Sequence, residues 1–341
     1  MNEKNEIMKK TILSLLMAGA ALAAAAQSAP VVAPEPLRVG DKVAVMSIAS
    51  TPRDSVAERA AAVLEQWGFK PVIMPHVTAN HHGFAGTVEE RLSDLTACLH
   101  DPEVKAIVST RGGYGSSMLL EPLTRDTLAR YGNKWIVGYS DITAIHSAMV
   151  CAGHQSLHAN MGGYIGSHSA TDSLNLLLRD VLMGKRPTYT VPGHEFNRPG
   201  SATGIVVGGN MAVFSNIAGS RDFDFLDRDN LADRDIILFF EDVGENISRV
   251  SSMFTQLVVK GVMKRVKGVI VGRFTEYSPS NGYETMEAML RERLAPYGDI
   301  PICFDFPVSH DESWNYPMIV GGTATLAVPA DGGPVTLIYH E

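Results

Sequence analysis

Cysteine is scarce in this chain, and the few that occur form no pattern. Three cysteines, Cys98, Cys151 and Cys303, lie far apart among 341 residues, and an odd, widely spaced set gives neither a disulfide framework nor a metal site. The sequence also has no His-Glu-x-x-His segment and no paired cysteines of the kind that bind zinc. We therefore expect no metal and no other cofactor, and we expect Cys98 to lie in a helix core.

An excess of positive charge is also missing. The chain has 29 Lys and Arg against 37 Asp and Glu, a net charge of −8, and no long basic stripe. This balance argues against a protein that binds nucleic acid. With 45% apolar and 19% charged residues, the composition is ordinary for a soluble enzyme of one large or two medium domains.

No apolar run is long enough to span a membrane. The longest, Thr11–Ala26, has 16 residues, against roughly 20 for a transmembrane helix. It follows the basic Met8-Lys9-Lys10 and ends in three alanines before Gln27, as an export signal does. We expect residues 1–26 to be a signal peptide and residues 27–36 a proline-rich tether. The mature protein would be periplasmic or secreted, with no stable membrane span.

Strand-like and helix-like segments alternate through the first half of the chain. Val56–Trp67 has helical spacing, and Thr87-Val88-Glu89-Glu90 is a capping box that opens another helix. Such alternation is typical of a parallel sheet covered on both faces, in which functional groups gather at the carboxyl ends of the strands. The expected strands are 43–48, 71–74, 106–109 and 135–137.

A segment rich in glycine and proline, residues 183–200, divides the chain. We interpret it as a linker between an N-terminal domain, residues 37–182, and a C-terminal domain, residues 201–341. In the second half we expect strands at 205–207, 236–240, 268–271 and 324–328, and a helix at 250–260.

A serine at the end of an expected strand is the leading candidate for chemistry. In Ile136-Val137-Gly138-Tyr139-Ser140-Asp141 an apolar run stops at glycine, and Ser140 then precedes a helix-starting Asp141. A sharp strand-to-helix turn exposes such a hydroxyl. The second glycine of Gly-x-Ser-x-Gly is absent, and an ordinary helix cap is the alternative.

A serine nucleophile needs a base and an acid that orients the base. Glu241 directly follows the apolar run 236–240, and His310 follows a short apolar segment. Asp242 and Glu245 are rival acids. The glycine loop after the third expected strand, Gly112-Gly113-Tyr114-Gly115, is either a tight turn or a loop whose amides approach a substrate carbonyl.

Together these segments resemble the serine LD-carboxypeptidase family, which includes the microcin C self-immunity hydrolases. The resemblance runs from Leu37 to the C-terminus. The segments that carry it, in family order, are Asp101–Ile107, Arg111–Gly115, Gly138–Asp141, Gly208–Asn210, Glu241–Glu245, Gly268–Phe274 and a proline-and-histidine segment ending at Pro317. The chain departs from the family pattern at two places: His158-Ala159-Asn160-Met161 stands for His-Gly-Pro-Met, and Ser309-His310 for Gly-His.

The resemblance implies a fold, a reaction and a set of roles. It implies a flavodoxin-like, parallel-sheet N-terminal domain and a smaller, β-rich α/β C-terminal domain, with the active site between them. The catalytic triad would be Ser140, Glu241 and His310, and the amides of Gly113 and Asp141 would form the oxyanion hole. The substrate would be a murein tetrapeptide, from which the enzyme removes the terminal D-alanine.

Some alternatives stay open from sequence. Arg111 could bind a substrate carboxylate or form a strand-end salt bridge. The activity could instead be hydrolysis of an aminoacyl-nucleotide-like toxin, within the same family. A signal peptide followed by two α/β lobes also describes a periplasmic solute-binding protein, and an α/β-hydrolase has the same order of serine, acid and histidine. A homodimer is also open.

Overall fold

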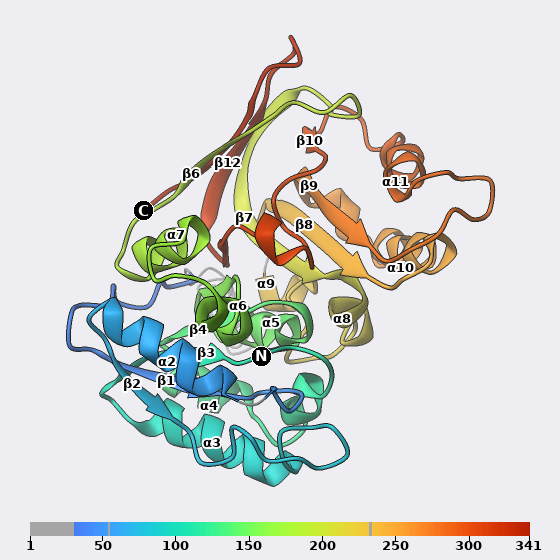
Figure 1. Cartoon of the computed structure of the whole chain (residues 1–341). Coiled ribbons are helices and arrows are strands. Elements are labelled where there is room, and N and C mark those ends of the chain that lie inside the picture. Colours follow the sequence, from blue (N-terminus) through green and yellow to red (C-terminus); the bar gives the residue numbers. More distant parts are fainter. Residues whose placement is uncertain (1–30, 54, 232–233) are drawn as a thin grey trace, which may run out of the picture.

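The computed structural model describes residues 31–341 apart from residues 54 and 232–233. The predicted signal peptide and residues 27–30 of the predicted tether lie outside the described residues. The described chain forms two sheets, with the N-terminal sheet below the C-terminal one in Figure 1. Within the described ranges, no helix is long and apolar enough to cross a bilayer.

The first sheet has six strands in the order β11-β5-β4-β3-β1-β2. Strands β1 to β5 are all parallel, and their order is that of a flavodoxin-like doubly wound domain, as expected. The strands are β1 (Lys42–Met46), β2 (Lys70–Ile73), β3 (Val104–Ser109), β4 (Trp135–Gly138) and β5 (Ser156–His158). The α-helices are α2 (Val56–Gln66), α3 (Val88–His100), α4 (Arg125–Tyr131), α5 (Thr143–Cys151), α6 (Gly162–Ser167) and α7 (Ser173–Leu182).

Local sequence explains where these elements begin and what they bury. The Thr87 hydroxyl accepts a hydrogen bond from the Glu90 amide, and the Glu90 carboxylate accepts one from the Thr87 amide, so the predicted capping box of α3 is present. Cys98 on the same helix is buried, as expected. The strand residues Ala44 and Val45, which lie on opposite faces of the sheet, are both fully buried, as in a sheet that helices cover on both faces.

The second sheet has seven strands in the order β10-β9-β8-β7-β12-β13-β6. Strands β7 to β10 are parallel, whereas β12, β13 and β6 continue the sheet antiparallel. The strands are β6 (Thr188–Val191), β7 (Gly200–Asn210), β8 (Ile236–Val243), β9 (Val266–Thr275), β10 (Ile302–Cys303), β12 (Thr323–Val328) and β13 (Val335–Tyr339). The α-helices are α8 (Met211–Asn216), α9 (Arg228–Leu231), α10 (Ile247–Val259) and α11 (Met286–Leu294). The predicted β-rich second domain is therefore confirmed.

Three segments are integrated into the fold more closely than the sequence suggested. Strand β11 (Met318–Val320) comes from the second half but pairs antiparallel with β5 of the first sheet. Strand β6 lies inside the segment predicted as a linker, and it pairs with β13. The described part of the predicted tether is docked, because the Val32 amide donates to the Gly153 carbonyl at 2.8 Å.

Candidate active site

Ser140 lies at the carboxyl end of β4, at the start of a 3₁₀ turn (Ser140–Ile142) that leads into α5. Its φ angle is +60°, a left-handed conformation that costs a residue with a side chain about 1–3 kcal/mol and that clusters at functional sites. Gly112 of the neighbouring loop approaches closely, because a Cβ placed there would lie 3.2 Å from the Ser140 Oγ. The strand-to-helix turn therefore presents the hydroxyl to a glycine-lined space.

Ser140, His310 and Glu241 form one hydrogen-bonded chain across the two sheets. The His310 Nε2 lies 2.8 Å from the Ser140 Oγ, and the His310 Nδ1 lies 2.5 Å from the Glu241 Oε2. Ser140 follows β4, Glu241 lies on β8, and His310 comes from the loop after β10. The structure thus brings together three residues that the sequence places far apart.

The charges around the hydrogen-bonded triad favour the protonated form of His310. Burial disfavours the imidazolium of His310, but the Glu241 carboxylate more than offsets this, and the pKa of His310 is raised above its ordinary value. The Glu241 side chain is fully buried, and its Oε1 has no hydrogen-bond partner among the described residues. The free-energy cost of burying this carboxylate is therefore offset mainly by its hydrogen bond to His310.

The rival acids have other partners. Asp242 accepts hydrogen bonds from the Asn210 side chain and the Ala212 amide, and burial raises its pKa to about 6. Glu245 lies 3.9 Å from Arg249 in the next turn of the chain. Of the three acids considered from sequence, Glu241 is the one hydrogen-bonded to His310.

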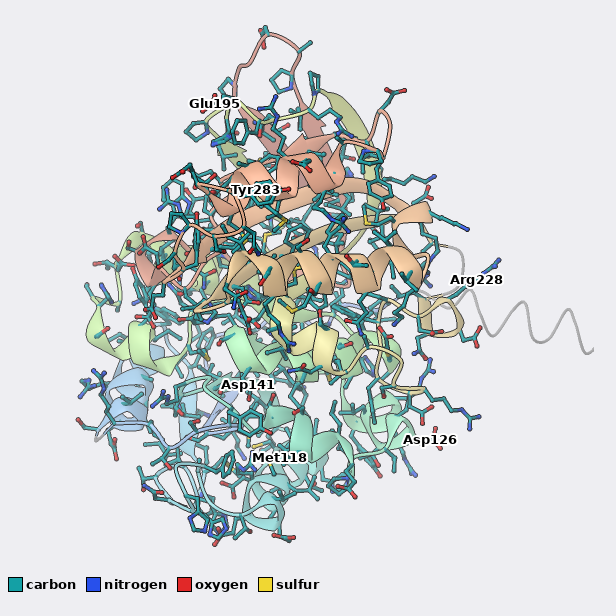
Figure 2. The ribbon with its side chains drawn as sticks, turned by 90° about the vertical axis from the view of Figure 1, so that its right-hand side faces the viewer. Met118, Asp126, Asp141, Glu195, Arg228 and Tyr283 are labelled. Atoms are coloured by element: carbon teal, nitrogen blue, oxygen red, sulfur yellow. The ribbon has the colours of Figure 1, made fainter. Side chains whose placement is uncertain are left out.

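The glycine loop after β3 lies against the nucleophile. A Cβ on Gly112 would lie 3.4 Å from the Asp141 amide nitrogen, and Gly113 has a φ of +104°. The Gly113 amide makes no hydrogen bond to any described residue. Asp141 is buried, and Figure 2 shows it at the level where the two halves of the chain meet. Of the two predicted oxyanion donors, Asp141 directly follows Ser140, and Gly113 directly follows Gly112, the glycine that approaches the Ser140 Oγ.

Arg111 has no ion pair with a described carboxylate; its Nη1 donates to the Thr51 carbonyl at 3.3 Å. The expected alternative of a strand-end salt bridge is therefore not seen. Arg111 lines a cavity of about 390 Å³, together with Pro52, Arg53, Val56, Arg59, Thr110, Gly163, Ser167 and Glu312. A pocket with three arginines in its wall suits a ligand that carries carboxylates.

Sequence analysis missed Ser50, which holds the glycine loop in place. The Ser50 Oγ accepts a hydrogen bond from the Tyr114 amide at 3.2 Å, and the Ser50 amide donates to the Gly112 carbonyl at 3.2 Å. A Cβ on Gly113 would collide with the same hydroxyl. Its place in the sequence could have indicated Ser50, because it follows β1 at the carboxyl edge of the sheet, where Arg111 and Ser140 also lie.

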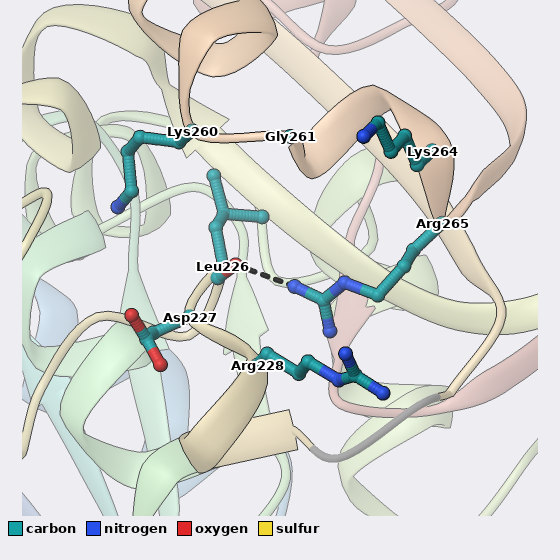
Figure 3. Close-up of a pocket in the computed structure, with 7 residues that line it drawn as sticks. All are labelled: Leu226, Asp227, Arg228, Lys260, Gly261, Lys264 and Arg265. Carbon is teal, nitrogen blue, oxygen red and sulfur yellow. Dashed lines mark hydrogen bonds between the residues drawn. The ribbon is translucent and has the colours of Figure 1, made fainter.

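A second cavity, of about 450 Å³, lies in the second half of the chain and contains none of these residues. It is lined by Leu226, Asp227, Arg228, Lys260, Gly261, Lys264 and Arg265 (Figure 3). Two of the cations that line it already have partners: Lys260 pairs with Asp224, and Arg265 donates to the Leu226 carbonyl. We therefore place the functional site at Ser140.

Comparison with known proteins gives a consistent result. The model for the LD-carboxypeptidase N-terminal domain matches residues 43–159, and the model for the C-terminal domain of the same family matches residues 203–326. A Synechocystis sp. protein with a carboxypeptidase name is 32% identical over 90% of this chain and 96% of its own length. The microcin C7 self-immunity protein of Escherichia coli is 26% identical over 86% of this chain and 91% of its own.

A solved structure gives the same picture in three dimensions. The muramoyltetrapeptide carboxypeptidase from Oxalobacter formigenes superimposes with a TM-score of 0.76 at 28% identity, over 88% of this chain and 99% of that protein. The similarity therefore extends over most of both halves of the chain.

Proposed function

Because the chain belongs to the LD-carboxypeptidase family of serine peptidases, we propose that it removes the terminal D-alanine from murein tetrapeptides through an acyl-enzyme. The observation that carries this proposal is the hydrogen-bonded chain from Ser140 through His310 to Glu241. The relation to a muramoyltetrapeptide carboxypeptidase supports the choice of substrate.

In the first step His310 takes the proton of the Ser140 hydroxyl at its Nε2, and the Oγ attacks the carbonyl of the last peptide bond. Glu241 holds the imidazole by its Nδ1 and stabilises the imidazolium that forms. His310 then gives the proton to the leaving amine of D-alanine. A water molecule, deprotonated by His310 in turn, hydrolyses the ester and frees Ser140.

The amides of Gly113 and Asp141 hold the oxygen that becomes negative in each tetrahedral intermediate. Two observations support this role: Asp141 directly follows the nucleophile, and Gly112, the neighbour of Gly113, lies against Ser140. Loss of one such donor typically raises the barrier by about 2.7–4 kcal/mol. Because the donors are backbone groups, a side-chain substitution can remove them only by displacing the loop.

Arg111 binds the terminal carboxylate of the substrate. Its exposed guanidinium borders the cavity beside the glycine loop, and a carboxypeptidase must distinguish a free C-terminus from an internal peptide bond. A planar guanidinium does so by paired hydrogen bonds to both carboxylate oxygens.

The direct test is to incubate the mature protein with murein tetrapeptide and to analyse the products by mass spectrometry. We expect tripeptide and D-alanine from the wild type and neither from Ser140→Ala. Equal release by a folded Ser140→Ala variant would refute the assignment of the nucleophile. A serine-directed fluorophosphonate provides a test that needs no substrate, since it labels an activated serine and not a solute-binding protein.

A second candidate is hydrolysis of an aminoacyl-nucleotide-like toxin, which the relation to the microcin C7 self-immunity protein favours. The same triad would perform it. Parallel assays with murein tetrapeptide and an aminoacyl sulfamoyl adenosine separate the two, because the preferred substrate has the higher kcat/KM.

The N-terminal sequence supports a further proposal, that residues 1–26 direct export and are removed. Expression of the full chain followed by mass spectrometry of the mature protein is expected to give Gln27 as the first residue. A mature protein that retains residues 1–26 would contradict it.

A further inference from the structure

The loop that carries His310 is anchored on both sides of the boundary between the two sheets. On the C-terminal side the Arg273 amide of β9 donates to the Val308 carbonyl at 3.0 Å, and the Phe306 amide donates to the Val271 carbonyl at 3.2 Å. These bonds fix the loop before the histidine. The segment after the histidine turns toward the N-terminal sheet.

Asn160 holds that second segment. Its Nδ2 donates to the Glu312 carbonyl at 2.9 Å, and its Oδ1 accepts from the Asn315 Nδ2 at 2.9 Å. Asn315 in turn accepts from the amide of Ser309, the residue before His310, at 3.4 Å. Asn160, Asn315 and Ser309 are 4%, 1% and 0% exposed, so water does not compete for these bonds.

The register of the first sheet explains why Asn160 is suited to this task. Gly138 of β4 and His158 of β5 are paired residues in the parallel ladder. Ser140 and Asn160 therefore each lie two residues beyond a matched pair, at the same edge of neighbouring strands. The Ala159 amide also donates to the Gly138 carbonyl at 3.0 Å, which links the two strand ends directly.

A second contact ties the loop to the serine turn. The hydroxyl of Tyr139, the residue before Ser140, donates to the Glu312 Oε1 at 3.1 Å. Asn160 thus holds the backbone of Glu312, and Tyr139 holds its side chain. The position of His310 relative to Ser140 is set from the sheet that carries Ser140 itself.

We propose that Asn160 is a positioning residue, which holds the His310 loop against the N-terminal sheet so that His310 reaches Ser140. The proposal rests on the proposed role of His310 as the base. Asn160 and Ser309 are two of the three positions at which this chain departs from the family pattern that it otherwise resembles; Ala159 is the third. A proline at position 160 could make neither side-chain hydrogen bond, so the anchor belongs to this chain's own sequence.

Positioning has a measurable signature. A misplacement of about 1 Å between reacting groups can cost 10²-fold in rate. The three arginines of the cavity do not depend on Asn160, although Glu312 in its wall does. Loss of Asn160 should therefore lower kcat and the rate of fluorophosphonate labelling of Ser140 by much larger factors than it changes KM.

The experiment compares Asn160→Leu with a matched control, Asn175→Leu. Asn175 is also buried and donates its Nδ2 to the carbonyls of Ile165 and Ser169, but it does not contact the His310 loop. Each variant is assayed for thermal stability, kcat, KM and labelling rate. If Asn160→Leu does not fold, Asn160→Ala, which removes the same two bonds without added bulk, takes its place.

We expect kcat and the labelling rate of the Asn160 variant to fall about 100-fold, with a much smaller change in KM. We expect Asn175→Leu to lose stability but keep its kcat. A folded Asn160 variant with wild-type kcat and labelling would overturn the proposal, as would an equal loss of kcat in both variants. A wild type that labels but releases no D-alanine refutes the proposed substrate alone, because the labelling rates still test Asn160.

Discussion

Ser140 has a backbone conformation that any side chain disfavours, and this gives a prediction about stability. Glycine adopts a φ of +60° without a steric penalty. We expect Ser140→Gly and Ser140→Ala to be equally inactive, and the glycine variant to be more stable than the alanine variant by about 1 kcal/mol. Urea denaturation of the two proteins measures the difference. Equal free energies of unfolding would show that the turn carries no strain.

Glu241 and Glu245 provide a comparison four residues apart. Glu241→Gln leaves a neutral amide that cannot stabilise the imidazolium of His310. In a comparable triad such a change lowers kcat by about 10⁴-fold. We expect a loss of that order for Glu241→Gln and little change for Glu245→Gln, whose nearest charged partner is Arg249. Steady-state kinetics, with circular dichroism to check folding, decide the matter. A large loss of kcat in Glu245→Gln instead would show that Glu245 is the acid of the triad.

The pH profile should report the raised pKa of His310. The imidazole must be neutral to accept the serine proton, so kcat/KM falls as the pH drops below that pKa. Glu241 raises the pKa, with smaller contributions in the same direction from Asp242 and Glu276. We therefore expect the acid limb of the wild type above about pH 6.5, the ordinary value for histidine, and at lower pH in whatever activity Glu241→Gln retains. An unmoved limb would mean that another group titrates.

Among the elements, β9 contains a glycine that makes room for the active site. A Cβ on Gly272 would collide with the Val308 carbonyl and lie 3.1 Å from the Glu241 Cβ. We expect Gly272→Ala to displace the His310 loop. The variant should lose most of its kcat but keep most of its free energy of unfolding. Gly268→Ala on the same strand is the control, since its Cβ would meet only side-chain atoms at 3.3 Å or more. Equal activity in the two variants would contradict the prediction.

The long elements could be predicted from the sequence because their patterns are local. Helix α10 (Ile247–Val259) and strand β8 (Ile236–Val243) lie within a few residues of the expected segments. Strand β11 could not be predicted, because three residues carry no periodicity and its partner β5 lies far away in the sequence. Strand β6 could not be predicted either, because it lies between Pro187 and Pro192 in a segment whose composition is typical of a linker.

The candidate site also contains residues that local sequence patterns predict and residues whose roles depend on the whole fold. Ser140 and Glu241 each follow an apolar run, so their places just after β4 and near the end of β8 could be inferred from the sequence. The family resemblance supplied the role of His310. The roles of Ser50 and Asn160 could not be assigned from the sequence, because each acts on backbone groups of a loop whose position depends on the whole fold. Polar residues of this kind leave no motif in the sequence.

At the scale of the whole molecule, the crossing of β11 into the first sheet predicts a single unfolding transition. Buried hydrogen bonds also cross the boundary, from the Asn210 amide to the Thr143 hydroxyl and from the Phe225 amide to the Ser147 hydroxyl, each at 3.0 Å. We expect calorimetry to show one peak, with equal calorimetric and van't Hoff enthalpies. Two resolved peaks would mean that each half unfolds independently.

Strand β11 also has a consequence for the order of events during synthesis. Domains commonly fold from the N-terminus while the rest of the chain is still being made. Here one edge of the first sheet stays uncovered until residues 318–320 have left the ribosome, and an uncovered strand edge attracts other chains. We therefore expect chaperones to bind the nascent chain until residues 318–320 have emerged and paired with β5. Since His310 also arrives late, a truncated chain carries no active serine.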